Sequence, residues 1–200
     1  MPNFVYLASQ SPRRRQLLEQ LGVPYQLLLP EAGEDAEALE VALKNETPRA
    51  YVERVTGLKL DAAVARLQRR KLIRAPILCS DTTVAVGRTV YGKPANADDA
   101  SRMLRELSGR THRVLTAVAI QSGSRRLSTL STSRVTFAPL STLQIRSYVS
   151  TGEPMGKAGA YAIQGRAAQY ITRVDGSYSG IMGLPLHESA TLLRGVGITL

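Results

Sequence analysis

The sequence predicts an α/β domain built around a mixed β-sheet with helices packed against it. Strand-like and helix-like segments alternate along the chain, which is typical of sheets covered by helices. Several strand-like segments are also joined by turns too short for a crossover between parallel strands, so part of the sheet must be antiparallel. Two hundred residues, 44% of them apolar, suit one domain over residues 1–200, or one domain folded as two lobes around a cleft.

Five segments carry helix signals, which are an N-capping residue or an early proline followed by an apolar stripe. They are 12–21, 48–70, 96–107, 141–150 and 183–197. Thr47 caps the second and longest segment, and Gly57 predicts a break or bend within it. Gly109 closes the third segment.

Strand signals are short apolar or β-branched runs bounded by turn residues. They lie at 5–8, 26–29, 113–120, 125–137, 159–165 and 169–178, and on both sides of a Gly87-Arg88 turn within 75–94. The segment "QSGS" predicts that 113–120 and 125–137 form a hairpin. The stretch 30–48 is the most acidic and loop-like part of the chain, and we expect it at the rim of a site.

The chain is strongly basic, with a formal net charge of +10 and a sequence pI of about 10.2. This charge favours polyanionic partners, either nucleic acid or nucleotides. The sequence lacks zinc-finger spacing, a long Lys/Arg tail and basic segments interleaved with aromatics, so we expect no stable nucleic-acid partner. It also lacks an apolar run long enough for a membrane span and a signal-peptide core. With Cys79 as the single cysteine, these features favour a cytoplasmic protein that does not contact membranes.

Three arginines, residues 13–15, fill the first turn of the first predicted helix, where the helix dipole disfavours cations. Arg14 falls on the apolar face of that helix, and Arg13 lies at its edge. Ser9 and Ser11 add hydroxyl groups on the same turn. A phosphate would satisfy the helix N-terminus, the hydroxyls and the guanidinium groups together. The alternative is a solvated basic turn with Ser11 as an ordinary N-cap.

The Gly87-Arg88 hairpin predicts a second group of polar residues. A two-residue loop at this turn places Thr82 opposite Lys93, and Lys93 then lies beside Asp81. An aspartate in a strand is costly without a partner, which suits a metal-bound carboxylate or a general base, while the lysine could meet a phosphate oxygen. The alternative is a structural Asp–Lys pair at the edge of the sheet.

The glycine-rich stretch 153–171 is the third candidate site. Its glycines and alanines permit close backbone approach, and the amide of Gln164 can read the edge of a base. Glycine-rich loops are common, so this stretch alone indicates little. His112 and His187 have no partner pattern typical of zinc sites, and no Walker A, GxGxxG or GxSxG motif is present.

Four motifs together resemble a known family. "LASQSPRRRQLLEQLG", "SDTTVAV…GKP", "KAGAYAIQG" and "DGSYSGIMGLPL" are similar, in order and spacing, to the motifs of the Maf-like nucleotide pyrophosphatases, from about Tyr6 to Leu193. The resemblance implies hydrolysis of nucleoside triphosphates to the monophosphate and pyrophosphate, with Mg²⁺ or Mn²⁺. It also implies an inosine-triphosphatase-like fold, in which an elongated mixed sheet flanked by helices forms two lobes around a central cleft, and a homodimer.

The resemblance also assigns roles to individual residues. Asp81 matches the catalytic proton acceptor and a metal contact, and Glu34 matches an acidic loop position that would also contact the metal. The acidic pair of that loop is shifted by one residue here, so the metal contact remains open between Glu34 and Asp35. The residues assigned to phosphate binding are Ser9, Ser11, Arg13, Arg14, Lys59 and Lys93.

Three positions resemble the dTTP/UTP-preferring branch of the family: Arg13, Thr82 and Gln164. An amide such as that of Gln164 can pair with N3–H and O4 of uracil or thymine, and Thr82 would read the same edge. The expected substrates are therefore dTTP and UTP, in standard or modified form. The competing hypotheses are a basic nucleic-acid-binding protein, and a nucleotide-binding regulator without turnover.

Overall fold

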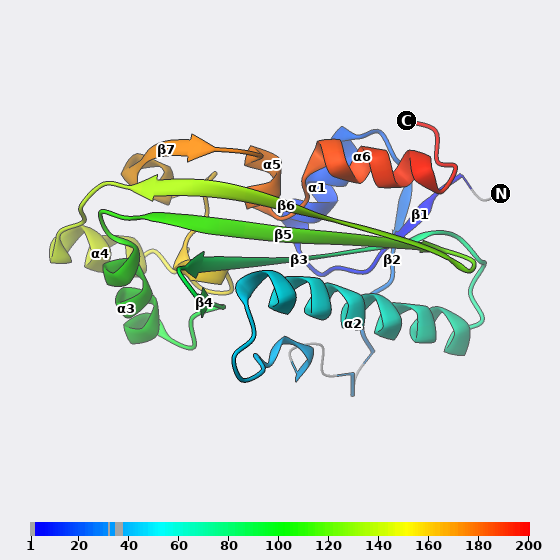
Figure 1. The fold of residues 1–200 in the computed structure, drawn as a ribbon, viewed down its shortest axis with the longest axis horizontal. Helices are drawn as coiled ribbons and strands as arrows, with labels where there is room; N and C mark the ends of the chain where they lie inside the picture. Colours follow the sequence, from blue (N-terminus) through cyan, green and yellow to red (C-terminus); the bar gives the residue numbers. More distant parts are fainter. Residues whose placement is uncertain (1–2, 32, 35–37) are drawn as a thin grey trace.

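The computed structural model describes residues 3–31, 33–34 and 38–200, and these form a seven-stranded mixed sheet with helices against it (Figure 1). The strands are β1 (Val5–Leu7), β2 (Tyr25–Leu27), β3 (Ile77–Val86), β4 (Thr89–Tyr91), β5 (Thr111–Ser122), β6 (Arg125–Phe137) and β7 (Ile171–Asp175). The sheet order is β2-β1-β3-β5-β6-β7, with β4 added on β3. β1 is parallel to β2 and β3, and the remaining pairs are antiparallel, so the predicted mixed sheet is confirmed.

All five predicted helices are present, together with one short helix that was not predicted, α5. They are α1 (Pro12–Gln20), α2 (Pro48–Arg69), α3 (Ala97–Leu107), α4 (Thr142–Val149), α5 (Tyr178–Met182) and α6 (Leu186–Gly195), with short 3-10 turns η1 (Ala38–Glu40), η2 (Ala158–Ala160) and η3 (Arg166–Tyr170). The predicted caps form: Thr47 accepts from Ala50 N at 3.2 Å, and Asn96 accepts from Asp99 N at 2.9 Å. None of the helices in the described ranges has the length and apolar character that crossing a membrane requires.

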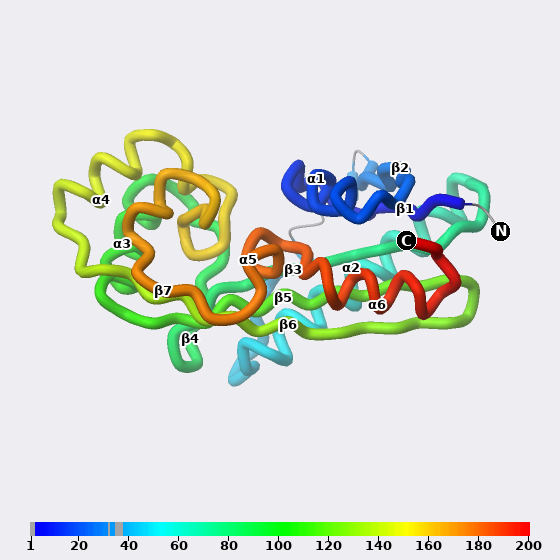
Figure 2. The backbone as a smooth tube through the Cα atoms, turned by 90° about the horizontal axis from the view of Figure 1, so that it is seen from above, coloured from blue at the N-terminus to red at the C-terminus, as the bar shows by residue number. Residues whose placement is uncertain are grey.

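The molecule is elongated, because the β5–β6 hairpin runs along most of its length (Figure 1). Separate apolar clusters pack near the two ends of this hairpin. We call the end formed by β1, α1 and α6 the first lobe, and the end formed by α3, α4, η2 and η3 the second lobe (Figure 2). α2 packs against β3 and β5 on the other face of the sheet from α6. The sheet therefore joins two lobes, as predicted.

Between the lobes, one edge of β3 has no strand partner among the described residues. β1 pairs with β3 as far as Leu78, and β4 begins to pair at Val84. The carbonyl of Leu78 points toward β1, where it accepts from Ala8 N at 3.0 Å. Because the backbone groups of a strand alternate between its two edges, Ser80 and Thr82 also direct their N–H and C=O groups to this open edge. The interrupted ladder thus presents polar backbone to the space between the lobes.

α2 is continuous through Gly57, so the expected break is absent. Val55 and Leu60, on either side of the glycine, are both fully buried. A glycine in a helix interior costs about 1 kcal/mol relative to alanine. Burial of the flanking apolar residues outweighs that cost, because each such side chain contributes roughly 1.5–3 kcal/mol.

The prediction of a strand at 159–165 is wrong. This stretch begins with η2 and continues into a turn. Gly159 and Ala160 have φ angles of +69° and +59°, in the left-handed region that a strand cannot contain. Glycine is required at 159, since a Cβ there would lie 2.9 Å from Cγ2 of Val84. The small residues of this segment serve a close turn against β3 instead of a strand.

The burial of His112 leads us to expect that the stability of the fold depends on pH. It is buried in the second lobe, with Nε2 2.8 Å from the hydroxyl of Tyr161. Burial lowers the pKa of His112 from 6.5 to about 4. Between these values the unfolded chain binds the additional proton, so the free energy of unfolding should fall as the pH drops from about 6.5 to 4, by up to roughly 3 kcal/mol.

The measurement is urea unfolding across this pH range for wild type, His112→Gln and His187→Gln. Glutamine at 112 can still accept from Tyr161 but does not titrate, so it should flatten the curve of unfolding free energy against pH. His187 is exposed and serves as the control. Equal slopes in all three proteins would contradict a buried, neutral His112.

Candidate active site

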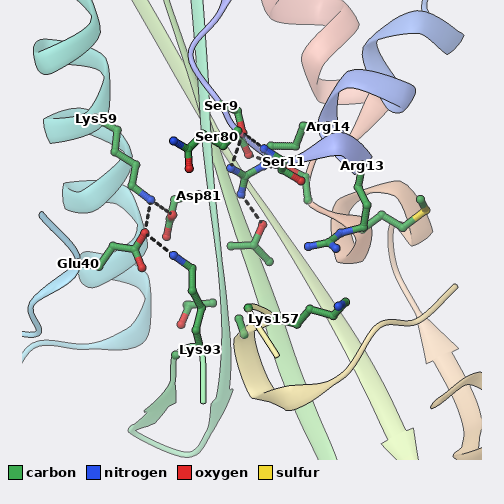
Figure 3. A pocket seen from close by; sticks show the side chains of 18 of the residues that line it. Ser9, Ser11, Arg13, Arg14, Glu40, Lys59, Ser80, Asp81, Lys93 and Lys157 are labelled. Atoms are coloured by element: carbon green, nitrogen blue, oxygen red, sulfur yellow. Dashed lines mark hydrogen bonds and ion pairs between the residues drawn. The ribbon is translucent and has the colours of Figure 1, made fainter. Parts of the chain in front are cut away.

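A cavity of about 700 Å³ lies between the lobes, at the open edge of β3 (Figure 3). α1, α2, β3, α5 and the segment 155–164 contribute to its walls. Ten candidate residues taken from the sequence, all within the described ranges, line this one cavity: Ser9, Ser11, Arg13, Arg14, Glu34, Lys59, Asp81, Thr82, Lys93 and Gln164. Tertiary folding thus brings the separate motifs to a single site.

Two carboxylates meet on one lysine at the α2 side of the cavity (Figure 3). Asp81 Oδ1 lies 2.5 Å from Lys59 Nζ, and Glu40 Oε1 lies 2.7 Å from the same nitrogen. Lys93 Nζ reaches Glu40 Oε1 at 3.4 Å. Burial raises the pKa of Glu40, but Lys59 and then Lys93 outweigh this effect, so its pKa is lowered overall. The carboxylate of Glu40 is therefore held in the ionised form that a metal ligand requires.

Glu40 was not among the residues predicted from the sequence. Its backbone is tied to α2, because the hydroxyl of Tyr51 donates to the carbonyl of Glu40 at 2.9 Å and Arg54 donates to the carbonyl of Val41 at 2.9 Å. Burial, followed by the negative charges of Asp81 and Glu40, raises the pKa of Tyr51 to about 12. These contacts hold an acidic side chain from the predicted rim segment at the centre of the site.

The predicted hairpin geometry is confirmed at the turn, where Val86 pairs with Thr89. The β3–β4 pairing reaches Val84 and ends before Asp81. Asp81 instead meets Lys59 from α2, and Lys93 joins the cluster through Glu40. The strand pairing alone therefore does not describe how Asp81 is held.

Arg14 projects from α1 into the cavity and is held by three uncharged acceptors. Nε donates to the carbonyl of Gly183 at 2.9 Å, while the terminal nitrogens donate to Ser9 Oγ at 3.3 Å and Thr82 Oγ1 at 3.4 Å. Burial lowers the pKa of Arg14, partly offset by the charge of Asp81. A partly buried cation bound only to neutral oxygens is poorly compensated, and a bound anion would supply the missing charge.

Ser11 and Arg15 of the first motif differ in their positions relative to the cavity. Ser11 is the N-cap residue of α1, but its side chain makes no capping hydrogen bond, so it is not the ordinary N-cap of the alternative interpretation. Its backbone N–H donates to Ser9 Oγ at 3.2 Å. Arg15 lies outside the cavity lining and donates to the carbonyl of Gln10 at 3.3 Å.

Two further cations, Arg13 and Lys157, face the cavity on the side opposite Lys59 (Figure 3). Burial lowers the pKa of Arg13, and burial followed by the charge of Arg13 lowers the pKa of Lys157. Their mutual repulsion is relieved when an anion lies between them. Lys157, which belongs to the "KAG" motif, was missed as a site residue because its contacts depend on the turn at η2.

Gln164 is exposed in a turn at the second-lobe end of the cavity. The carboxylate of Glu153 holds this turn: it accepts from Arg166 N at 3.0 Å and from the hydroxyl of Tyr148 at 2.8 Å. Gly165 allows this approach, because a Cβ there would lie 2.2 Å from Glu153 Oε1. The apolar residues that line this end of the cavity are Val84, Val114, Met155, Tyr161, Ile163, Ile181 and Met182. This end suits a flat apolar group with a polar edge.

Glu34 lines the opposite end of the cavity, where it is engaged by arginines. Its carboxylate accepts from Arg66 and from Arg69, and these contacts lower its pKa. Arg66 also donates to the carbonyl of Leu28 at 2.9 Å. Asp35, the other acidic residue considered for the metal, lies outside the described residues.

The carboxylate pair fits a hard divalent cation. Asp81 and Glu40 provide oxygen ligands within hydrogen-bond distance of one ammonium group, so they lie close to each other. Over the described ranges, no three His, Cys, Asp or Glu side chains gather into a metal-binding group. Mg²⁺ commonly uses one or two carboxylates and takes its remaining ligands from water and substrate phosphates, so this pair is sufficient.

The fold and cavity define an α/β protein with a cleft lined by several cations, in which the carboxylates of Asp81 and Glu40 meet on Lys59. Residues 4–196 match the family model described as "Maf-like protein", and the chain belongs to the Maf-like family. Two curated relatives have the name "dTTP/UTP pyrophosphatase". The protein of Polaromonas sp. (strain JS666 / ATCC BAA-500) is 69% identical, covering 98% of this chain and 97% of its own. That of Albidiferax ferrireducens (strain ATCC BAA-621 / DSM 15236 / T118) is 64% identical, covering 98% of each chain.

Among solved structures, the Staphylococcus aureus Ham1 protein matches with a TM-score of 0.50 over 96% of this chain and 98% of its own. Sequence identity is only 13%, so this likeness concerns the fold alone. It confirms the inosine-triphosphatase-like architecture that the motifs implied.

Proposed function

We propose that the protein hydrolyses dTTP and UTP to the nucleoside monophosphate and pyrophosphate. Membership of the Maf-like family and the names of the relatives support this proposal. The observation that carries it is the arrangement of charge in the cavity. Asp81 and Glu40 meet on Lys59, while Arg14 is left with neutral acceptors alone among its hydrogen-bond partners in the described part of the chain.

The triphosphate accounts for the remaining positive charge. Its phosphates would lie between Arg14 and the two lysines Lys59 and Lys93, with Ser9 and Ser11 as hydroxyl donors. The developing charge on the leaving pyrophosphate is stabilised by these fixed cations, which need no rearrangement during the reaction. Arg13 and Lys157 neutralise charge on the side toward the nucleoside.

In the proposed reaction a water molecule attacks the α-phosphorus, and Asp81 accepts its proton. The bond from the α-phosphorus to the oxygen that bridges to the β-phosphorus breaks, and pyrophosphate leaves with that oxygen. Lys59 holds the Asp81 carboxylate in place through its 2.5 Å contact. General-base assistance of this kind contributes about 10²–10⁴-fold to the rate.

Asp81 and Glu40 would hold the divalent cation, Mg²⁺ or Mn²⁺, which supplies charge neutralisation on the phosphate oxygens when it is bound. The family resemblance implied Glu34 for this role, with Asp35 left open as the alternative. We prefer Glu40 because Glu34 is engaged by Arg66 and Arg69, whereas Glu40 shares Lys59 with Asp81.

Glu40→Gln and Glu34→Gln separate these assignments. Glu40→Gln should raise the Mn²⁺ dissociation constant by about 10–100-fold. This constant is measured from the paramagnetic resonance signal of free Mn²⁺. The same substitution should raise the Mg²⁺ concentration needed for half-maximal activity similarly. Glu34→Gln should leave both within about twofold, and EDTA should abolish turnover in wild type. A larger loss of Mn²⁺ affinity in Glu34→Gln than in Glu40→Gln would return the metal to Glu34.

The pyrimidine would occupy the apolar second-lobe end of the cavity. There the amide of Gln164 can donate to O4 and accept from N3–H of uracil or thymine. Cytosine presents the opposite pattern at these atoms. Because Glu153 holds the turn that carries Gln164, the amide is presented from a defined backbone position.

The first test is pyrophosphate release from dTTP, UTP, CTP, GTP, ATP and 7-methyl-GTP, with Mg²⁺, with Mn²⁺ and with EDTA. Metal-dependent release that is fastest with dTTP and UTP supports the proposal. Release that is fastest with another nucleotide would retain the pyrophosphatase and reject the base selectivity. Binding of dTTP without release would identify a nucleotide-binding regulator, and salt-dependent binding of DNA or RNA without release would favour a nucleic-acid-binding protein.

We also propose that the protein acts as a homodimer in the cytoplasm. The resemblance to the family motifs supports the dimer, and the single cysteine, Cys79, suits a reducing compartment. Light scattering at micromolar concentration should give twice the chain mass of 21.7 kDa, and a monomer mass would reject the dimer.

A further inference from the structure

We propose that Thr82 and Thr116 are positioning residues that hold Arg14 through a hydrogen-bond chain of fixed direction. This inference rests on the proposed function, because it assigns how the phosphate-binding arginine of that site is set. It gives Thr82 a role in addition to the contact with the pyrimidine that the resemblance implied.

The direction of the chain follows from its last member. Thr116 Oγ1 donates to the carbonyl of Gly180 at 2.7 Å, and a carbonyl can only accept, so this bond uses the single hydroxyl hydrogen of Thr116. Thr82 Oγ1 lies 3.0 Å from Thr116 Oγ1, and Thr82 must therefore be the donor in that contact. Its own hydrogen is then also used.

Thr82 is left as an acceptor only, and Arg14 occupies that side. The terminal nitrogen of Arg14 donates to Thr82 Oγ1 at 3.4 Å. No hydroxyl hydrogen remains for O4 or O2 of a pyrimidine, so Thr82 could contact the base only by accepting from N3–H. The chain thus runs from Arg14 through Thr82 and Thr116 to Gly180, and every bond in it points the same way.

α5 closes this arrangement at both ends. The carbonyl of Gly180 terminates the chain, and the carbonyl of Gly183 accepts from Arg14 Nε at 2.9 Å and from Ser80 Oγ at 2.8 Å. Gly183 has a φ of +118°, and a Cβ there would lie 3.2 Å from Arg14 Nε. The "GSYSGIMG" part of the fourth motif, whose role the sequence did not explain, therefore provides two carbonyl groups that fix the arginine from opposite sides.

Thr116 makes the inference testable. It is 1% exposed and does not belong to the cavity lining, so it cannot contact the base. If Thr82 acts through Arg14, removing the hydroxyl of Thr116 should weaken phosphate binding as removal of the Thr82 hydroxyl does. If Thr82 acts on the base alone, removing the hydroxyl of Thr116 should leave phosphate binding unchanged.

The experiment compares Thr82→Val, Thr116→Val, the double variant and Thr116→Ser. The control is Thr111→Val, which removes a hydroxyl from the 2.8 Å Thr111–Thr136 pair between β5 and β6, outside the cavity lining. Two quantities are measured: the dissociation constant for inorganic pyrophosphate by calorimetry, and kcat/KM for dTTP, UTP and CTP. Thermal unfolding shows which variants are folded.

We expect Thr82→Val and Thr116→Val each to weaken pyrophosphate binding and kcat/KM by about tenfold, the effect of losing one hydrogen bond in such a chain. The dTTP:CTP ratio of Thr116→Val should stay within about twofold, because Thr116 does not line the cavity. The double variant should be no weaker than about tenfold, because both substitutions break one chain. Thr116→Ser, which keeps the hydroxyl, and Thr111→Val should resemble wild type.

Unchanged pyrophosphate binding in Thr116→Val or in Thr82→Val would overturn the proposal. If Thr116→Val is unfolded, Thr82→Val and Thr82→Ser are compared in the same assays, and pyrophosphate binding in Thr82→Val as tight as in Thr82→Ser would overturn it. Failure of the proposed function looks different: wild type would release no pyrophosphate from any nucleotide. The calorimetric comparison does not depend on turnover.

Discussion

Asp81→Asn is expected to reduce kcat for dTTP by about 10³-fold or more while the substrate still binds. Asparagine keeps the shape of the side chain but cannot accept a proton at neutral pH, and it offers the metal one neutral oxygen. Asp81 is 7% exposed and meets Lys59 at 2.5 Å, so the substitution also leaves that ammonium with one carboxylate, Glu40. The measurements are steady-state pyrophosphate release and the affinity for a dTTP analogue with a non-hydrolysable α–β linkage.

Asp61→Asn is the matched control, because Asp61 is an exposed carboxylate on α2 that pairs with Arg126 outside the cavity lining. It should have wild-type kinetics. Near-normal turnover in Asp81→Asn would exclude Asp81 as the base. Loss of analogue binding together with turnover would instead identify it mainly as a structural or metal-binding residue.

Lys59→Met should produce the second largest loss, about 10²–10³-fold in kcat. Lys59 is the cation that Asp81 and Glu40 share, and methionine keeps most of its length and apolar volume without the charge. Two effects combine in the variant. The leaving pyrophosphate loses a fixed cation, and the two carboxylates lose the positive charge that offsets their mutual repulsion.

The second effect is visible in the pH dependence. Lys59 is the larger of the two lysine contributions that lower the pKa of Glu40, so this pKa should rise in Lys59→Met and the acidic limb of the kcat profile should move to higher pH. Lys44→Met, at an exposed loop position, is the control. If Lys59→Met keeps the wild-type pH profile and rate, Lys59 neither lowers the pKa of Glu40 nor contributes to turnover.

Local patterns predicted most of the elements correctly. Caps, early prolines and tight turns depend on neighbouring residues, so α1 to α4, α6 and the two hairpins follow from the sequence. The predicted strand at 159–165 failed because its glycines and alanines have no side chains that distinguish a strand from a left-handed turn. Only the contact of Gly159 with Val84 decides between them.

The same distinction applies to the candidate site. The helical wheel correctly placed Arg14 on the inward face of α1, since that direction depends on a periodicity within one helix. The partner of Asp81 could not be obtained in this way. Lys59 comes from α2, which packs against the sheet, and Glu40 comes from a segment fixed by Tyr51 and Arg54, so both depend on long-range packing.

The sequence by itself determined the fold class, the family resemblance and the group of residues that line one cavity, because these depend on periodicity, caps and the order of motifs. The tertiary structure alone decided how those residues pair. It placed Glu40 with Lys59, engaged Glu34 with Arg66, and brought Thr82 into contact with Arg14 and Thr116. The physical reason is that ion pairs and hydrogen bonds form over about 3 Å, and residues distant in the sequence reach that range only after the sheet and helices have packed.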